Sequence, residues 1–75
     1  MLTLDKVDLN QEVRITAING ERALKRRIMD MGITKGTNVK IVRVAPLGDP
    51  IDILVRGYQL SIRMADAEHI SVETI

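Results

Sequence analysis

The sequence predicts a mainly β fold: a small five-stranded barrel, with one amphipathic helix inserted after the first strand and a short helical turn before the last. Short runs of alternating apolar and polar residues, rich in valine and isoleucine, recur along the chain. Residues that favour turns (glycine, proline and asparagine) separate these runs. One stretch, between the first two runs, has instead the 3.6-residue spacing of a helix.

The first strand is predicted over Glu12–Ile18, where β-branched residues are frequent and the pattern alternates. This alternation should turn Val13 and Ile15 towards the core. A loosely apolar lead-in over residues 2–9 precedes the strand, and Asn10-Gln11 is typical of a turn.

The helix is predicted over Glu21–Met31. Three residues share one face at helical spacing: Leu24, Ile28 and Met31. We expect this face to dock on the barrel, with Leu24 and Ile28 in the core, because about three turns of helix are too short to persist alone in water. Asn19 is expected to cap the start of the helix, and Gly32 to end it with a positive φ.

The rest of the chain predicts three strands, one helical turn and a short last strand. These are expected over Val39–Ala45, Ile51–Arg56, Tyr58–Arg63, Ala65–Glu68 and Ile70–Val72, respectively. The alternation slips inside the second strand, so this strand is either buried on both sides or bent by a bulge, and we favour strong curvature. Hairpin-connected strands of this number and length favour an SH3-like barrel, whose closure would leave no long edges exposed.

Composition limits what this chain can do. Its 75 residues make one domain, residues 1–75, with no cysteine, one histidine and a net charge of +1. Without cysteine, a Ser–His–acid arrangement or a glycine-rich phosphate loop, we expect no enzyme activity and no cofactor. No run of residues approaches the length of a membrane span and no secretory signal precedes the domain, so a cytoplasmic location is expected.

Five short motifs occur in an order and spacing that are specific together, although each is weak alone. They are Ala23–Arg27, Met29–Ile33, Gly36-Thr37, Pro46–Pro50 and Arg56–Tyr58. From Leu9 to Val72 the chain resembles the FeoA family of ferrous iron transport accessory proteins. It departs from the family pattern at Asn10, where glycine is common, and at Lys35, where proline is common. Asparagine tolerates left-handed geometry, so the first turn should survive.

The resemblance implies an SH3-like barrel that assists a large GTP-dependent ferrous iron permease of the FeoB type by contacting its cytosolic region. From the near-neutral charge and the lack of a long apolar run, we expect no binding to nucleic acid, and a link to the membrane only through the permease; self-association stays open. Two alternatives remain. Lys25-Arg26-Arg27 could begin a nucleic-acid surface, but the chain lacks aromatic platforms. A related barrel occurs in iron-dependent repressors, so a metal-sensing domain is the second alternative.

Seven residues are candidates for partner binding: Arg22, Lys25, Arg26, Met29, Leu47, Asp49 and Tyr58. The first four share the outer face of the predicted helix, which is either a docking surface or an ordinary solvated face. Leu47 and Asp49 lie in a loop that is either a recognition tip or only a hairpin turn.

Tyr58, the only aromatic residue, could anchor an interface, but we expect it to pack partly into the core. His69 has Asp66 and Glu68 nearby and could bind transition metal ions. We favour a surface histidine in an acidic turn, because the sequence offers no second histidine to complete a metal site.

Overall fold

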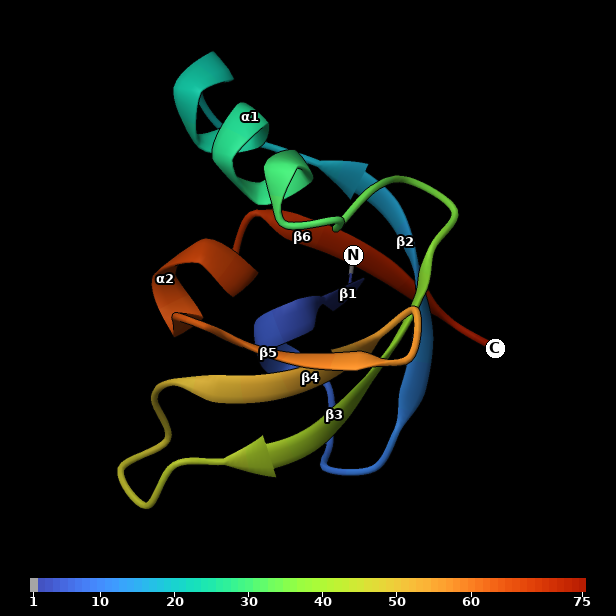
Figure 1. Ribbon diagram of the computed structural model, residues 1–75, viewed down its shortest axis with the longest axis vertical. Coiled ribbons are helices and arrows are strands. Elements are labelled where there is room, and N and C mark those ends of the chain that lie inside the picture. The colour runs from blue at the N-terminus through green and yellow to red at the C-terminus, as the bar shows by residue number, and fades with distance from the viewer. Residues whose placement is uncertain (1) are drawn as a thin grey trace.

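The computed structural model describes residues 2–75, and its architecture confirms the predicted mainly β, SH3-like class (Figure 1). The elements, in chain order, are β1 (Leu2–Thr3), a 3-10 helix η1 (Leu4–Lys6), β2 (Glu12–Ile18), α1 (Arg22–Asp30), β3 (Asn38–Val44), β4 (Ile51–Val55), β5 (Tyr58–Ile62), α2 (Met64–Ala67) and β6 (Ile70–Thr74). The five predicted strands correspond to β2–β6. The sequence missed β1, which adds a sixth strand.

All strands belong to one antiparallel sheet with the order β1-β6-β2-β3-β4-β5. Within residues 2–75, no backbone pairing joins β1 to β5, so the hydrogen-bonded ladder is open at this seam. The expectation that closure leaves no long edge exposed is therefore wrong for β5. The short helices η1 and α2 lie in contact with each other, and each contributes one fully buried side chain to the core, Leu4 and Ala67.

Curvature of the sheet comes from two irregularities. The pairing of β3 with β4 shifts between Ile41 and Arg43, and the pairing of β2 with β6 shifts between Ile15 and Ala17. In β3, Ile41 is buried whereas Val44 is 43% exposed. A bulge, rather than burial on both sides, therefore accounts for the broken alternation in this strand.

The core is built almost entirely from aliphatic side chains of the inner sheet face and the elements packed on it. Its members are Leu4, Val13, Ile15, Ile28, Ile33, Val39, Ile41, Ile51, Ile53, Val55, Ile62, Ala67, Ile70 and Val72. Val13 and Ile15 face inward as predicted. Among residues 2–75, no helix has the length and apolar character that crossing a lipid bilayer requires.

The helix α1 stands on one end of the barrel (Figure 1). Ile28 is fully buried, as expected of a core residue, but Leu24 and Met31 are half-buried and pack against the core from outside, so the placement of Leu24 in the core is wrong. Gly32 follows the helix with φ +88°, as predicted. At the other end, the residue that caps α1 is Glu21.

Asn19 does not cap α1, contrary to the prediction. Its amide Nδ2 instead donates a hydrogen bond of 2.8 Å to Oγ of the buried Ser71 in β6. This bond satisfies a polar group of the interior and fixes the end of β2 to β6.

Candidate functional site

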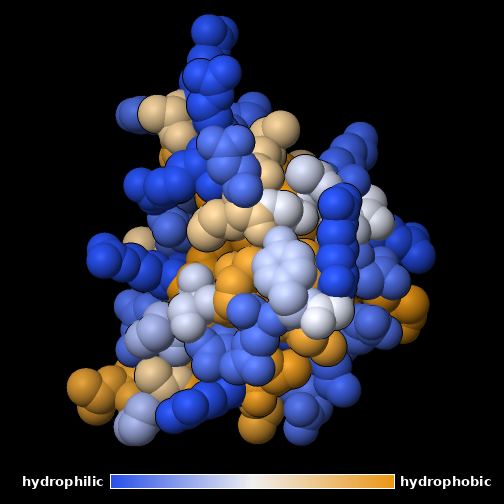
Figure 2. All heavy atoms as spheres, viewed as in Figure 1, coloured by the Kyte–Doolittle hydropathy of each residue, from blue (hydrophilic) through white to orange (hydrophobic). Residues whose placement is uncertain are grey.

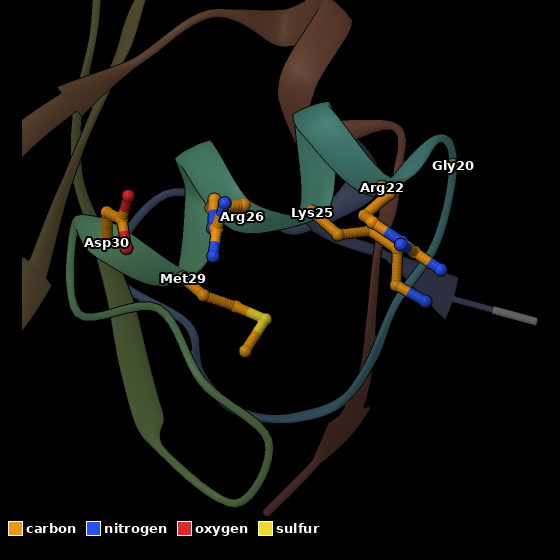
Figure 3. Close-up of a pocket in the computed structure, with 6 residues that line it drawn as sticks. All are labelled: Gly20, Arg22, Lys25, Arg26, Met29 and Asp30. Atoms are coloured by element: carbon orange, nitrogen blue, oxygen red, sulfur yellow. The ribbon is translucent and has the colours of Figure 1, made fainter.

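Four of the predicted contact residues line one hollow on α1, with a volume of about 400 Å³ (Figure 3). The hollow is lined by Gly20, Arg22, Lys25, Arg26, Met29 and Asp30. Figure 3 shows the side chains of Arg22 and Lys25 running in the same direction, with Met29 projecting from a later turn of the helix. The helix thus gathers three cations and one thioether on one surface.

Helical spacing explains this grouping. Arg22, Lys25, Arg26 and Met29 follow one another at i, i+3, i+4 and i+7, which places them on one face. Because Ile28 anchors another face in the core, this face is left to solvent, and Met29 remains 48% exposed. An exposed, flexible and polarizable methionine is well suited to contact a second apolar surface.

The three cations of this hollow form no ion pair among residues 2–75, although the carboxylate of Asp30 also lines the hollow. In the part of the chain described, the ion pairs are Arg14–Glu73 at 3.1 Å and Arg27–Asp66 at 2.8 Å. Neither involves a cation of the hollow. The first turn of α1 contains no acidic residue either, although Glu21 occupies the N-cap position, and the helix dipole is positive at that end. The side chains and the dipole therefore attract the same kind of ligand, an acidic one.

Leu47 and Asp49 lie far from α1, in the loop between β3 and β4 at the other end of the barrel (Figure 1). Leu47 is 97% exposed, so it is available for contact with a partner. Asp49 has a structural role, because its Oδ1 accepts a hydrogen bond of 3.0 Å from the backbone N–H of Met64 at the start of α2. The structure does not join this loop to the hollow on α1.

Tyr58, at the start of β5, lies in a third place. Its side chain is 44% exposed and is neither in the hydrophobic core of residues 2–75 nor among the residues packed against it, so the expectation that it packs partly into the core is wrong. The hydroxyl donates a hydrogen bond of 2.7 Å to the backbone carbonyl of Met31, just after α1. Tyr58 therefore links the sheet to the end of the helix, and its role in partner binding stays a prediction.

We expect Tyr58→Phe to lower the free energy of unfolding by about 1 kcal/mol, because it removes one hydrogen bond and keeps the ring. Urea denaturation monitored by circular dichroism measures the change. Gln59→Ala, also in β5, is the matched control, because it removes a side-chain hydrogen bond of 3.3 Å that goes to Asp52 within the sheet and not to the end of α1. A loss no larger than that of the control would contradict the linking role of the hydroxyl.

A second hollow, which the sequence did not predict, lies between α1, β5 and α2 and has a volume of about 440 Å³. It is lined by Arg27, Met31, Ser61, Ile62, Arg63, Ala65 and Asp66. Figure 2 shows hydrophobic atoms at the bottom of a depression near the centre of this face. Three separate elements form the hollow, so no pattern within one element predicts it. The one sequence feature that could have pointed to it is the basic Arg63, directly after a strand.

His69 is half-buried, and its ring lies beside Gly20. Within residues 2–75, no group of three or more histidine, cysteine, aspartate or glutamate residues is placed to hold a metal ion.

The FeoA domain model of protein families matches residues 2–74. The chain belongs to the FeoA domain family. An FeoA-like protein from Clostridium acetobutylicum, solved by NMR, is 42% identical and superposes with a TM-score of 0.93, over 99% of this chain and 86% of that one. An FeoA from Stenotrophomonas maltophilia, described as an SH3 domain protein and crystallised with zinc, is 23% identical, with a TM-score of 0.83 over 97% of this chain and 91% of that one. At that identity it supports the fold alone.

A curated relative from Porphyromonas gingivalis is described as a fusion of Fe(2+) transport protein A with the Fe(2+) transporter FeoB. It is 31% identical to this FeoA-family chain over 74 residues, which are 99% of this chain but only 9% of the fusion protein. The similarity therefore concerns one small part of that polypeptide.

Proposed function

We propose that this FeoA-family chain is a cytoplasmic accessory protein of ferrous iron uptake, which binds the cytosolic region of a FeoB-type permease through the hollow on α1. The observation that carries the proposal is the group of three cations around the exposed Met29, none of which forms an ion pair in the described part of the chain. The proposed mechanism is recognition, with no chemical step on this chain.

The physical argument has two parts. Cations on the rim of an interface attract an acidic partner over a distance and orient it, which raises the association rate. Met29 then supplies apolar contact area at the centre, where its flexible side chain can adapt to the partner. An acidic surface with one apolar depression is therefore the kind of partner that fits α1.

The fusion relative supports the choice of partner. There, a segment similar to this chain lies in the same polypeptide as a transporter described as FeoB. Fusion keeps two modules at a high effective concentration, which favours even weak contacts between them.

The direct test is a titration of this domain with the isolated cytosolic region of the permease, in the presence and in the absence of GTP. We expect the backbone amides of α1 to show the largest NMR shift changes. Shift changes confined to the Leu47 loop would show that the partner binds there and not on α1. The absence of shift changes both with and without GTP would overturn the proposed function. The same titration with single-stranded RNA tests the nucleic-acid alternative.

Reversal of the three charges on α1, as Arg22→Glu, Lys25→Glu and Arg26→Glu together, is expected to raise the Kd for the permease region by about tenfold or more, since each exposed pair contributes up to about 1 kcal/mol. The effect should shrink with added salt. The fold should be retained, because these side chains are exposed.

The matched control reverses three exposed cations elsewhere: Lys6, Lys35 and Arg43. It changes the net charge by the same amount and leaves α1 intact. Equal weakening by both triple variants would mean that only the overall charge matters, and would count against a specific site on α1.

A further inference from the structure

We propose that the outer edge of β5 takes up an extended peptide segment with an acidic side chain, which adds a strand to the sheet. This site is separate from the proposed contact surface on α1 and does not rest on the proposed function. The occupant is defined by its chemistry: an extended backbone, small apolar side chains and a carboxylate.

Unpaired backbone groups are the first observation. Among residues 2–75, β5 pairs only with β4, through a hairpin whose two-residue turn, Arg56-Gly57, has positive φ at both positions. In such a hairpin the residues next to the turn, Val55 and Tyr58, exchange hydrogen bonds, and bonded pairs then alternate along the ladder. The N–H and C=O groups of Gln59 and Ser61 therefore point away from β4.

Three of the usual protections of a sheet edge are missing from β5. Edge strands are commonly blocked by proline, by a bulge or by a very short length. β5 has five residues, contains no proline, and pairs with β4 in a continuous register. The opposite edge, β1, has only two residues. The long, regular edge is thus the one that can accept a strand.

The second hollow, beside this edge, defines the chemistry of the occupant. Met31, Ile62 and Ala65 supply apolar lining. Arg27 is paired with Asp66, whereas Arg63 is exposed and has no acidic partner among residues 2–75. A segment with apolar side chains towards the hollow and a carboxylate near Arg63 would cover the apolar lining and pair with the free guanidinium.

A second copy of this chain fits less well. Antiparallel pairing of two β5 strands with Gln59 opposite Ser61 would bring Arg63 of one copy beside the turn at Arg56 of the other. Like charges would then meet at both ends of the paired strands, which disfavours the dimer. Charge complementarity therefore selects an acidic segment.

The test uses an acetylated and amidated pentapeptide, Val-Thr-Val-Glu-Val, titrated into the isotopically labelled domain. We expect a Kd on the order of a millimolar, the level that a few backbone hydrogen bonds can support. The amide protons of Gln59 and Ser61 should show the largest shifts. Methylation of one alternate set of peptide amide nitrogens should abolish binding, and methylation of the other set should not.

Substitutions in β5 separate backbone pairing from side-chain contact. Ser61→Pro removes an outward N–H and leaves the ladder with β4 intact, so the domain should fold and lose the peptide. Ser61→Ala, which loses the hydroxyl bonded to Asp52 at 2.5 Å but keeps the N–H, is the matched control and should bind. Arg63→Glu should weaken binding of the peptide about fivefold. The same variant should bind a peptide with lysine in place of glutamate better than the original peptide.

Several outcomes would overturn the proposal. These are the absence of shifts at Gln59 and Ser61 at several millimolar peptide, equal binding of the two methylated peptides, or equal binding by folded Ser61→Pro and Ser61→Ala. Shifts of the same amides that grow with protein concentration, without peptide, would assign the edge to self-association instead. If Ser61→Pro fails to fold, the methylated peptides decide alone.

Discussion

Ile28→Ala is expected to lower the free energy of unfolding by about 2–5 kcal/mol, the usual range for removing a large aliphatic side chain from a core. Ile28 is the fully buried residue of α1, and its side chain joins the helix to the barrel core. A domain of this length has a total stability of roughly 4–11 kcal/mol. The loss therefore takes a large share of it and should release α1 before or together with the barrel.

Urea denaturation of Ile28→Ala, followed by circular dichroism, measures this effect. Leu24→Ala is the matched control on the same helix: Leu24 is half-buried, so its loss should be clearly smaller. Met29→Ala, at an exposed position, should stay within about 0.5 kcal/mol. Equal losses at Ile28 and Leu24 would mean that the helix is held by its whole apolar stripe and not mainly by one side chain.

Gly32→Ala is expected to cost about 2–3 kcal/mol, from two sources. With φ at +88°, any L side chain at this position adopts a left-handed conformation, which costs about 1–2 kcal/mol. In addition, a Cβ atom on Gly32 would overlap the hydroxyl of Tyr58. The overlap would break the bond from Tyr58 to Met31, worth about 1 kcal/mol.

Two controls separate these sources. Gly36 has nearly the same φ, +87°, but a Cβ there meets no atom within 4 Å, so Gly36→Ala should show the backbone cost alone. Removal of the hydroxyl by Tyr58→Phe should relieve the overlap, so Gly32→Ala should cost less in that background. Additive effects of the two substitutions would contradict the steric contact.

Most of the fold was predicted from the spacing of apolar residues within single elements. The bounds predicted for the first strand, Glu12–Ile18, agree with β2, because alternation of β-branched residues reports directly on a half-buried strand. Asn10 adopts φ +68°, as its tolerance of left-handed geometry suggests. The departure from glycine at that turn therefore leaves the turn intact.

Errors arose where a residue is governed by a distant part of the chain. Asn19 is a good helix cap in isolation, but its partner is Ser71, which only the folded sheet brings close. Tyr58 is held at the surface by the carbonyl of Met31, and two residues such as Leu2-Thr3 become a strand only because β6 pairs with them. None of these contacts can be predicted from the residues next to it in the sequence.

The candidate sites differ in the same way: a site within one element could be predicted, and a site formed by several elements could not. The surface on α1 could be predicted because residues of one helix face recur at fixed spacing, so Arg22 and Met29 were grouped from the sequence alone. The hollow beside β5 could not, because it brings together Met31, Ser61 and Ala65 from three elements. Of its apolar lining, only Met31 was given a role from the sequence, as part of the helix face that docks on the barrel.

The pairing of β1 with β6 sets Leu2 directly opposite Val72, so the chain enters and leaves the domain at nearly one point. Such a module can be attached by a short tether at either terminus, or inserted into a surface loop of a larger protein, with little strain on the barrel. Because α1 stands at one end of the barrel, an anchor at this point would leave the helix free to turn towards the protein that carries it (Figure 1).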